Sequence, residues 1–296
     1  MNSLDKKLVV ITGAASGIGE ALAHVCADAG AYLLLADIDS QRLKTLAAAL
    51  TAQFKNTGTS QRVLTQSCDV ASEADMHALA ATASLEFGGA DILINNAGVA
   101  LVAPILSGKL VDAHWLMDIN FWGVVHGCRA FASQMHARPD TVIVNISSIF
   151  AMLSLPTQSI YNASKAAVRA FSDSLREELR VSVNSDDAGD KHSIHVLCVH
   201  PGGIRTRLVE QARLGDITAM AADTDSLNQQ FKRIARTSPE QAAMAIMQAV
   251  SKRKTRLLIG ADARVGDFFY RLFPARASAW FAGLLRRQGR NGRSGN

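Results

Sequence analysis

A tyrosine and a lysine four residues apart could form an acid/base pair. Tyr161 and Lys165 fall near the start of a segment with helical periodicity, so their side chains project from one face, one turn apart. An ammonium group close to a phenol favours the phenolate, which predicts a pKa for Tyr161 below its usual value of about 10. Such a group is suited to proton transfer. For the pair taken alone, a solvated helix face is the alternative.

Two further polar residues could complete this site. Ser148 lies thirteen residues before Tyr161, directly after an apolar run, and its hydroxyl could donate a hydrogen bond to a substrate oxygen whose charge changes during reaction. The neighbouring Ser147 is the weaker candidate for this role. Asn120, a poor helix former within a helical segment, could hold a water that feeds protons toward Lys165. The alternative for Asn120 is an ordinary buried amide bonded to backbone.

A glycine-rich turn near the amino terminus is typical of phosphate-binding loops. The run Thr12-Gly13-Ala14-Ala15-Ser16-Gly17-Ile18-Gly19 follows the first strand-like segment and leads directly into a helical one. Gly13 permits the tight turn, Gly17 lets backbone N–H groups approach a pyrophosphate, and Gly19 allows close packing of helix on sheet. A purely structural turn is the alternative when the motif is taken alone.

Asp37 favours one nicotinamide cofactor over the other. It ends the second strand-like run, eighteen residues beyond Gly19, where a carboxylate can bind both hydroxyls of an adenosine ribose. The same carboxylate would repel the 2′-phosphate of NADP, and neither the glycine turn nor Ile38 supplies the arginine or lysine that NADP favours. These residues predict NAD, with NADP less favoured. The alternative is that Asp37 caps the helix beginning near Ser40.

Two further strand ends are expected beside the cofactor. Asp69 and Val70 follow the third strand-like run, and Asn96, Ala97 and Gly98 follow the fourth. Ligands of open α/β sheets bind at the carboxyl ends of the strands, so these residues are predicted to line the pocket. An ordinary loop is the alternative for the asparagine-glycine segment.

The elements that must position these residues alternate along the chain. Seven short apolar runs typical of strands alternate with helical segments, which predicts right-handed βαβ crossovers and an α/β fold with a mainly parallel sheet and helices on both faces. The predicted strands cover residues 8–12, 31–36, 62–68, 91–95, 141–147, 194–199 and 256–259, and the predicted helices cover residues 17–29, 40–54, 72–87, 106–137, 157–182 and 238–252.

Length and composition restrict the class of protein. The 296 residues, of which 48% are apolar, can build one large α/β domain with a substantial core. No apolar stretch approaches the roughly 20 residues that span a bilayer, and the amino terminus lacks a secretory pattern, so we expect a cytoplasmic location. The cysteines and histidines show no metal-ligand spacing, which predicts no metal.

The positive charge gathers at the carboxyl end. Residues 264–296 hold seven arginines and one aspartate, a net charge of +6. Because the whole chain has a net charge of +5, residues 1–263 carry about −1. We therefore divide the chain into a catalytic domain, 1–263, and a basic amphipathic extension, 264–296. The extension could cap the substrate pocket, lie on an anionic membrane surface, or pack on the protein or a sister subunit. Packing is favoured over lipid, and no nucleic-acid binding is implied for the catalytic domain.

Together these motifs resemble the short-chain dehydrogenase/reductase family over roughly residues 5–260. Six occur in the family's order: the glycine turn 12–19, Asn95-Asn96-Ala97-Gly98, Asn120, Ser148, Tyr161-Asn162-Ala163-Ser164-Lys165 and Pro201-Gly202. The resemblance implies a Rossmann-type doubly wound domain with strand order 3-2-1-4-5-6-7, and a homodimer or homotetramer. Two positions depart from the family's usual residues, Ala151 in place of a glycine and His200 before Pro201.

The resemblance also implies roles for individual residues. Tyr161 resembles the acid/base, Lys165 the residue that lowers its pKa and holds the nicotinamide ribose, Ser148 the oxyanion partner, and Asn120 the fourth catalytic member. Asp69 is implied at the adenine ring, with Asn96 beside it. The complete predicted cofactor set is Gly13, Ser16, Gly17, Ile18, Gly19, Asp37, Asp69, Val70, Asn96, Ala97, Gly98, Tyr161, Lys165, Pro201, Gly202 and Thr206.

The predicted function is that of an oxidoreductase. It would transfer a hydride between a nicotinamide cofactor, preferably NAD, and a small-molecule alcohol or carbonyl substrate, with Tyr161 as acid/base. Substrate specificity is expected to depend mainly on residues 203–237. The alternative is a dinucleotide-binding sensor or scaffold without turnover, which would have no need for an acid/base pair.

Overall fold

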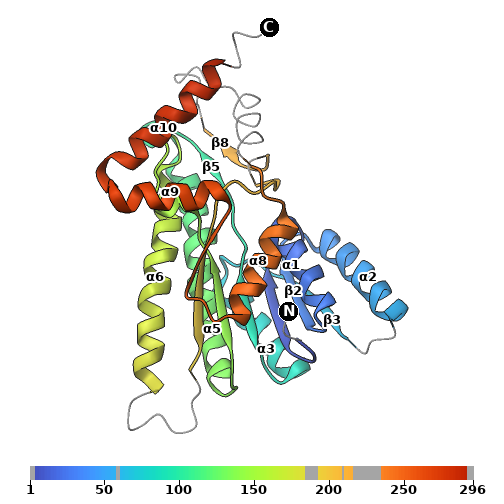
Figure 1. The fold of residues 1–296 in the computed structure, drawn as a ribbon. Helices are drawn as coiled ribbons and strands as arrows, with labels where there is room; N and C mark the ends of the chain where they lie inside the picture. Colours follow the sequence, from blue (N-terminus) through green and yellow to red (C-terminus); the bar gives the residue numbers. More distant parts are fainter. Residues whose placement is uncertain (1–3, 58–60, 184–192, 209, 216–234, 292–296) are drawn as a thin grey trace.

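A seven-stranded parallel sheet forms the centre of the molecule (Figure 1). The structure, a computed structural model, describes residues 4–57, 61–183, 193–208, 210–215 and 235–291. The strand order is β3-β2-β1-β4-β6-β7-β9. When the seven strands of this sheet are numbered alone, this is the predicted order 3-2-1-4-5-6-7, which confirms the Rossmann-type topology. The strands are β1 (Leu8–Thr12), β2 (Tyr32–Asp37), β3 (Val63–Ser67), β4 (Ile92–Asn95), β6 (Val142–Ile146), β7 (His195–Pro201) and β9 (Arg256–Ile259).

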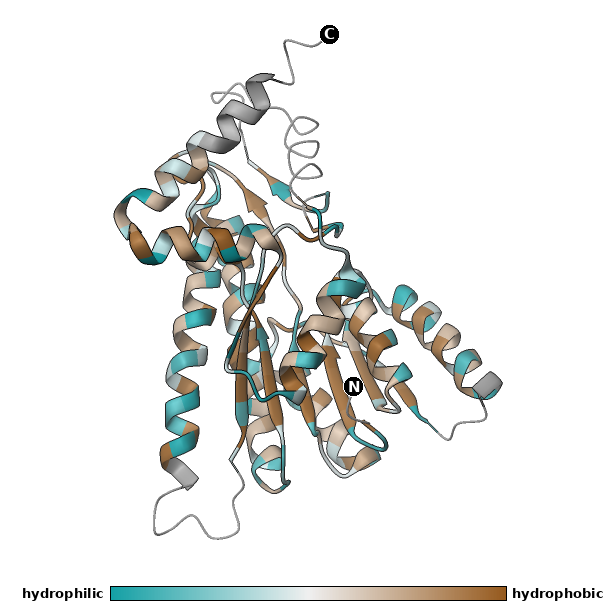
Figure 2. Ribbon diagram, viewed as in Figure 1, coloured by the Kyte–Doolittle hydropathy of each residue, from teal (hydrophilic) through white to brown (hydrophobic). Residues whose placement is uncertain are grey.

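Helices cover both faces of the sheet, because successive strand side chains point to opposite sides. In β1, Val9 and Ile11 join one buried apolar cluster, whereas Leu8 and Val10 join another. All five residues of this strand are buried, as expected for a strand covered on both faces and as the apolar centre of Figure 2 shows. One layer contains α1 (Gly17–Asp28), α2 (Ser40–Thr57) and α8 (Pro239–Ser251), and the other contains α3 (Glu73–Phe87), α5 (Gly123–His136) and α6 (Ser159–Val183).

The long helix predicted over residues 106–137 is interrupted. Regular helix begins only at α4 (Leu110–Met117), because a turn closed by the Gly108 N–H to the Pro104 carbonyl precedes it. A π-helical turn, Asp118–Trp122, then separates α4 from α5. Such turns occur mostly as single insertions within helices, frequently at functional sites, and apolar periodicity does not reveal them.

A second, two-stranded sheet was not predicted. It pairs β5 (Leu101–Val102) with β8 (Arg213–Leu214), and each strand has two residues. Runs this short carry no periodic signal, so only the folded chain brings them together.

The carboxyl-terminal residues form a helical hairpin on the body of the protein. It consists of α9 (Ala261–Leu272) and α10 (Pro274–Asn291), and α9 begins before the predicted boundary after residue 263. Ala277 is buried against the segment after β6, and Phe281 packs on the same cluster. The hairpin also exposes apolar side chains on its outer face: Val265, Phe268, Phe269, Leu272, Phe273 and Trp280.

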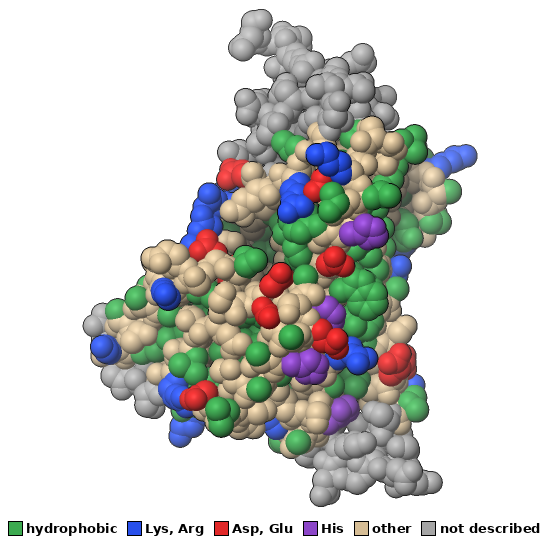
Figure 3. All heavy atoms as spheres, turned by 180° about the vertical axis from the view of Figure 1, so that it is seen from behind, with side chains coloured by type: hydrophobic (Ala, Val, Ile, Leu, Met, Phe, Trp, Pro, Cys, Tyr) green, Lys and Arg blue, Asp and Glu red, His purple; other side chains and the backbone are tan. Residues whose placement is uncertain are grey.

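The far side of the molecule has a mixed surface. Acidic and basic side chains are interspersed there, with apolar side chains between them (Figure 3). Within the described part of the chain, no helix is long and apolar enough to cross a membrane.

Candidate active site

The glycine turn between β1 and α1 forms a narrow cradle. Gly13 and Gly17 have φ values of +63° and +59°, a region that favours glycine. A Cβ atom on Gly19 would overlap the carbonyl oxygen of Gly13. The Asn96 amide holds the turn by donating hydrogen bonds of 3.0 Å to the carbonyl oxygens of Thr12 and Gly13. The turn therefore has the shape that close approach of a phosphate needs.

The start of α1 has donors available for an anion. Ser16 is the N-cap residue, and its side chain makes no capping hydrogen bond. Uncapped N–H groups at a helix start, together with the helix dipole, favour negative charge. Ser16, Gly17 and Ile18 all line the same cavity. These residues fit the diphosphate of a dinucleotide.

Substituting Gly13 with alanine should destabilise the protein and weaken cofactor binding. A Cβ at this position would lie 2.7 Å from the Ala97 Cα, and the left-handed backbone adds a cost of about 1 kcal/mol. We expect a total loss of about 2–4 kcal/mol in unfolding free energy, measured by urea denaturation. Gly283→Ala is the matched control, because nothing lies within 4 Å of a Cβ at this helical position. An unchanged midpoint for Gly13→Ala would contradict the cradle.

Asp37 holds the backbone around the expected ribose site. Its two carboxylate oxygens accept hydrogen bonds from the N–H groups of Ala15, at 2.9 Å, and Asp39, at 3.0 Å. The helix α2 is capped by Asp39, whose carboxylate accepts from the Arg42 N–H at 3.0 Å. Asp37 is thus not the capping residue, and it links the glycine turn to the end of β2 while lining the cavity.

Ser148, Tyr161 and Lys165 meet at the carboxyl end of β6. All three are buried and line one cavity. The Lys165 ammonium lies 5.9 Å from the centroid of the Tyr161 ring and donates a 3.1 Å hydrogen bond to the Ile146 carbonyl. The Ser147 hydroxyl donates to the Lys165 carbonyl at 2.8 Å, which ties α6 to the end of β6. Ser147 is therefore structural, and Ser148 presents its hydroxyl to the cavity.

Burial dominates the protonation of this pair. It raises the pKa of Tyr161 to about 12, although a hydrogen bond with Ser148 acts in the opposite direction. Burial likewise lowers the pKa of Lys165 to about 8. The shift is thus opposite to the expected depression of the tyrosine pKa, because burial is its largest cause. At neutral pH, Tyr161 is a protonated phenol that can donate its proton.

Asn120 lies in the π-helical turn and bonds backbone on both ends of its amide. Its Oδ1 accepts from the Val99 N–H at 2.8 Å, and its Nδ2 donates to the Val99 carbonyl at 2.9 Å. This is the buried amide of the alternative interpretation. A Cβ on Gly98 would lie 3.2 Å from Asn120 Oδ1 and 3.4 Å from Lys165 Nζ, so glycine lets the two approach. Asn120 thus positions the loop after β4 beside Lys165.

One cavity of about 660 Å³ joins the glycine turn to the candidate catalytic residues. It is lined by every predicted site residue except Gly19, which packs under the glycine turn, and Asn120, which lies behind Val99. Much of the predicted specificity segment, residues 209 and 216–234, lies outside the described residues.

Several residues of the cavity were not anticipated. Asp262, at the start of α9, accepts a 2.6 Å hydrogen bond from the Gly203 N–H and holds the segment after β7. Phe150 follows Ser148 in the chain, and Phe281 comes from α10. The one sequence signal for Asp262 is its position as an acidic residue in the first turn of a helix. Phe150 has no local signal, whereas Phe281 lies in the amphipathic extension, for which capping of the substrate pocket was one of the alternatives.

His200 lies directly behind Ser148. It is fully buried in β7, with its Nδ1 3.3 Å from the Ser148 carbonyl and its Nε2 without a hydrogen-bond partner. Burial lowers the pKa of His200 to about 4, so its ring is neutral at neutral pH. Its position supports the Ser148 backbone and does not open onto the cavity.

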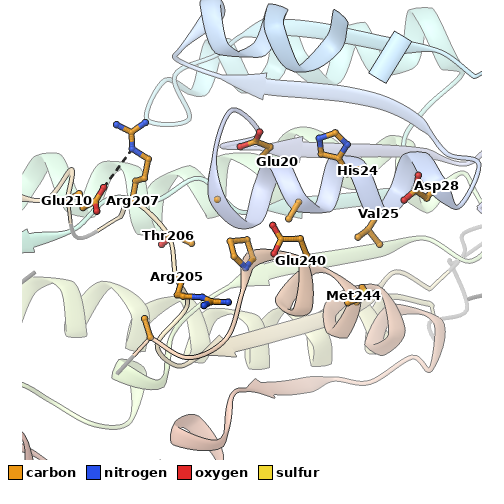
Figure 4. Close-up of a pocket in the computed structure, with 14 residues that line it drawn as sticks. Glu20, His24, Val25, Asp28, Arg205, Thr206, Arg207, Glu210, Glu240 and Met244 are labelled. Atoms are coloured by element: carbon orange, nitrogen blue, oxygen red, sulfur yellow. Dashed lines mark ion pairs between the residues drawn. The ribbon is translucent and has the colours of Figure 1, made fainter. Parts of the chain in front are cut away.

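A second cavity of about 940 Å³ lies between α1, α8 and the residues Arg205, Thr206, Arg207 and Glu210 (Figure 4). Glu20, His24 and Asp28 of α1 and Glu240 of α8 line it. It contains none of the catalytic candidates, and it meets the first cavity only at Gly17, Thr206 and Arg207. The residues that can do chemistry therefore belong to the first cavity.

Comparison with known proteins identifies relatives over nearly the whole chain. Residues 7–216 match the family model described as short chain dehydrogenase. The Mycobacterium tuberculosis protein named "Putative oxidoreductase SadH" is 39% identical over 276 residues, which cover 92% of each chain. The Xenopus laevis "Dehydrogenase/reductase SDR family member 7B" is 33% identical over 261 residues, 86% of this chain and 74% of that protein.

A solved structure agrees with these matches. The short-chain dehydrogenase/reductase from Burkholderia phymatum, in complex with NAD, is 30% identical and superposes with a TM-score of 0.75. The match covers 92% of this chain and 96% of that one. The fold, the glycine turn and the family match all agree, and the chain belongs to the short-chain dehydrogenase/reductase family.

Proposed function

We propose that this protein is an NAD-dependent oxidoreductase acting on secondary alcohols and ketones. The observation that carries the proposal is the single cavity in which Ser148, Tyr161 and Lys165 share walls with the glycine turn. A ligand whose diphosphate lies at the turn can extend along the carboxyl ends of the strands toward these side chains. The Burkholderia phymatum relative, solved with NAD, supports the choice of ligand.

The protonation of the three residues suits carbonyl reduction at neutral pH. NADH held at the glycine turn would supply the hydride that the carbonyl carbon accepts. Tyr161 donates its phenolic proton to the carbonyl oxygen, which becomes the alcohol hydroxyl. Ser148 donates a hydrogen bond to the same oxygen as negative charge develops on it. Lys165 stabilises the phenolate left on Tyr161, and alcohol oxidation is the reverse of this sequence.

Turnover tests the proposal directly. Purified protein is incubated with NADH and a panel of neutral ketones, or with NAD and the matching alcohols, and cofactor absorbance is followed. We expect turnover with members of the panel that needs no added metal. Tight NADH binding without turnover, and without any effect of Tyr161→Phe on binding, would instead favour the sensor alternative.

Alcohol oxidation should accelerate with rising pH. Because burial raises the pKa of Tyr161 to about 12, the phenolate that accepts the alcohol proton grows up to about tenfold per pH unit below that value. Reduction needs the protonated phenol and the Lys165 ammonium, and Lys165 is half deprotonated at about pH 8, so the reduction rate should stay level at neutral pH and fall as the pH passes about 8. Single-turnover rates in both directions between pH 6 and 10 measure this. An oxidation rate independent of pH would contradict it.

Asp37→Asn should shift the cofactor preference toward NADP. The amide keeps the size of the side chain but removes the charge that repels a 2′-phosphate. We expect the ratio of NADPH to NADH affinity to rise about 10- to 100-fold, measured by fluorescence titration. Asp39→Asn is the matched control, because Asp39 caps α2 and pairs with Arg42. A preference for NADPH in the unaltered protein would overturn this part of the proposal.

Assembly, domain division and location remain predictions. We expect a homodimer or homotetramer built through the long helices, a catalytic domain over residues 1–263 with the extension after it, and a cytoplasmic location. Asn120 is proposed to act in catalysis by positioning the loop after β4.

A further inference from the structure

The substrate end of the cavity is walled by aromatic side chains from two distant segments. The Phe150 ring lies 6.3 Å from the Tyr161 ring, with an interplanar angle of 75°. The Phe281 ring lies 6.4 Å from that of Phe150, at 63°. Both are edge-to-face arrangements that stabilise aromatic pairs. A row of rings thus leads from α10 to the acid/base, and Phe281 and Phe150 both line the cavity.

Apolar side chains continue this wall. The described residues that line the cavity away from the glycine turn include Val99, Ala100, Val102, Ile149, Leu155 and Ala282. Phe150 connects two buried apolar clusters, one under α9 and α10 and one around Tyr161. The uncharged polar residues Thr157, Gln158 and Gln211 also line the cavity. Binding a charged group against the apolar wall would require its desolvation without an opposite charge to compensate.

The charged residues of the cavity lie elsewhere or are already paired. Asp37 and Asp69 lie at the ends of β2 and β3, at the glycine-turn side of the sheet, and Asp262 is bonded to the Gly203 N–H. Arg207 lines both cavities together with Gly17 and Thr206, so it lies at the glycine-turn side. It forms an ion pair with Glu210 at 3.9 Å. Among the described lining residues, Lys165 is the cation near the aromatic wall.

We infer that the substrate is a neutral ketone or secondary alcohol with a sizeable apolar group, and that Phe281 is a specificity-determining residue for that group. The inference rests on the proposed function and narrows its substrate class. It gives the carboxyl-terminal hairpin a part in the active site. A molecule with its carbonyl oxygen between Ser148 and Tyr161 would direct its apolar group toward Phe150 and Phe281, and α10 would bury it.

Substrates of different length test this inference. The probes are 2-decanone, 2-butanone and 9-oxodecanoate, which share a methyl ketone and differ in apolar length or terminal charge. We expect the unaltered protein to prefer 2-decanone over both others. Phe281→Ala should lower kcat/KM for 2-decanone about 10- to 100-fold and for 2-butanone less than threefold. The Kd for NADH should stay the same.

Trp280→Ala is the matched control for loosening the hairpin. Trp280 packs on Phe273 and Phe269, at centroid distances of 5.1 and 6.5 Å, and does not line the cavity. The Trp280→Ala substitution should leave the ratio of kcat/KM values for 2-decanone and 2-butanone unchanged. An equal loss on both ketones in Phe281→Ala, or a preference for 9-oxodecanoate, would overturn the inference.

Thermal shift with NADH separates failure of this inference from failure of the proposed function. If 2-decanone raises the Tm of the NADH-loaded protein and Phe281→Ala abolishes the rise, apolar recognition holds even without turnover. Turnover of 2-butanone and 2-decanone with equal efficiency, and with no effect of Phe281→Ala, would leave the oxidoreductase proposal intact and reject the role of α10.

Discussion

Replacing Tyr161 with phenylalanine is expected to lower turnover about 10²- to 10⁴-fold, the range for loss of a positioned acid/base. The ring and its packing against Phe150 are retained, and the only atom removed is the hydroxyl that transfers the proton. The fall should appear in kcat for both ketone reduction and alcohol oxidation. The Kd for NADH should change less than threefold, because in the proposed binding mode the cradle and Asp37 would hold most of the dinucleotide.

Tyr32→Phe is the matched control for this substitution. Tyr32 starts β2 and packs on Phe87 at a centroid distance of 5.9 Å, and it does not line the cavity. Its hydroxyl should be dispensable for turnover. Activity of Tyr161→Phe within threefold of the unaltered protein would remove the acid/base role and, with it, the proposed mechanism.

Replacing Lys165 with methionine should abolish most activity and yet stabilise the fold. Burial lowers the pKa of Lys165 from 10.5 to about 8, so below pH 8 the folded protein keeps a charge that it has desolvated. Removing this charge should raise the free energy of unfolding by on the order of 1–3 kcal/mol at pH 7. Turnover should fall about 10²-fold or more, since the phenolate loses its nearby cation.

The dependence of stability on pH gives a second readout for Lys165. Between about pH 8 and 10.5 the unfolded chain binds the lysine proton and the folded chain has lost it, so unfolding free energy rises with pH in the unaltered protein. Lys165→Met should lack this rise. Urea denaturation at several pH values measures it, with Lys44→Met, an exposed position on α2, as control. If Lys165→Met lowered the free energy of unfolding, the interactions of the ammonium in the folded protein would outweigh its desolvation cost, contrary to this prediction.

Most of the scaffold of this site could be predicted from the sequence. Near-continuous apolar strands alternating with helices determine a doubly covered parallel sheet, and the residues after each strand then gather at one edge. That is why Asp37, Asp69, Gly98 and Ser148, although far apart along the chain, line one cavity. The order of the long strands, in contrast, was implied by the family resemblance, and the structure confirms it.

What local patterns could not predict depends on distant contacts or on burial. The spacing of Tyr161 and Lys165 revealed their proximity but not the desolvation that raises the tyrosine pKa. Asn120, in the π-helical turn, bonds Val99 twenty-one residues earlier, and β5 and β8 exist only because the chain brings them together. Phe281 reaches the cavity through the docking of α10, which no periodicity encodes.

The placement of α10 has a practical consequence for immobilising this protein on a bead or an electrode. The hairpin borders the substrate end of the cavity, whereas Leu4, near the opposite chain end, bonds the Ala29 carbonyl at the amino end of the sheet. A tether or affinity tag fused ahead of residue 4 would leave the cavity facing solution. A fusion after residue 291 would instead crowd the helix that forms its wall.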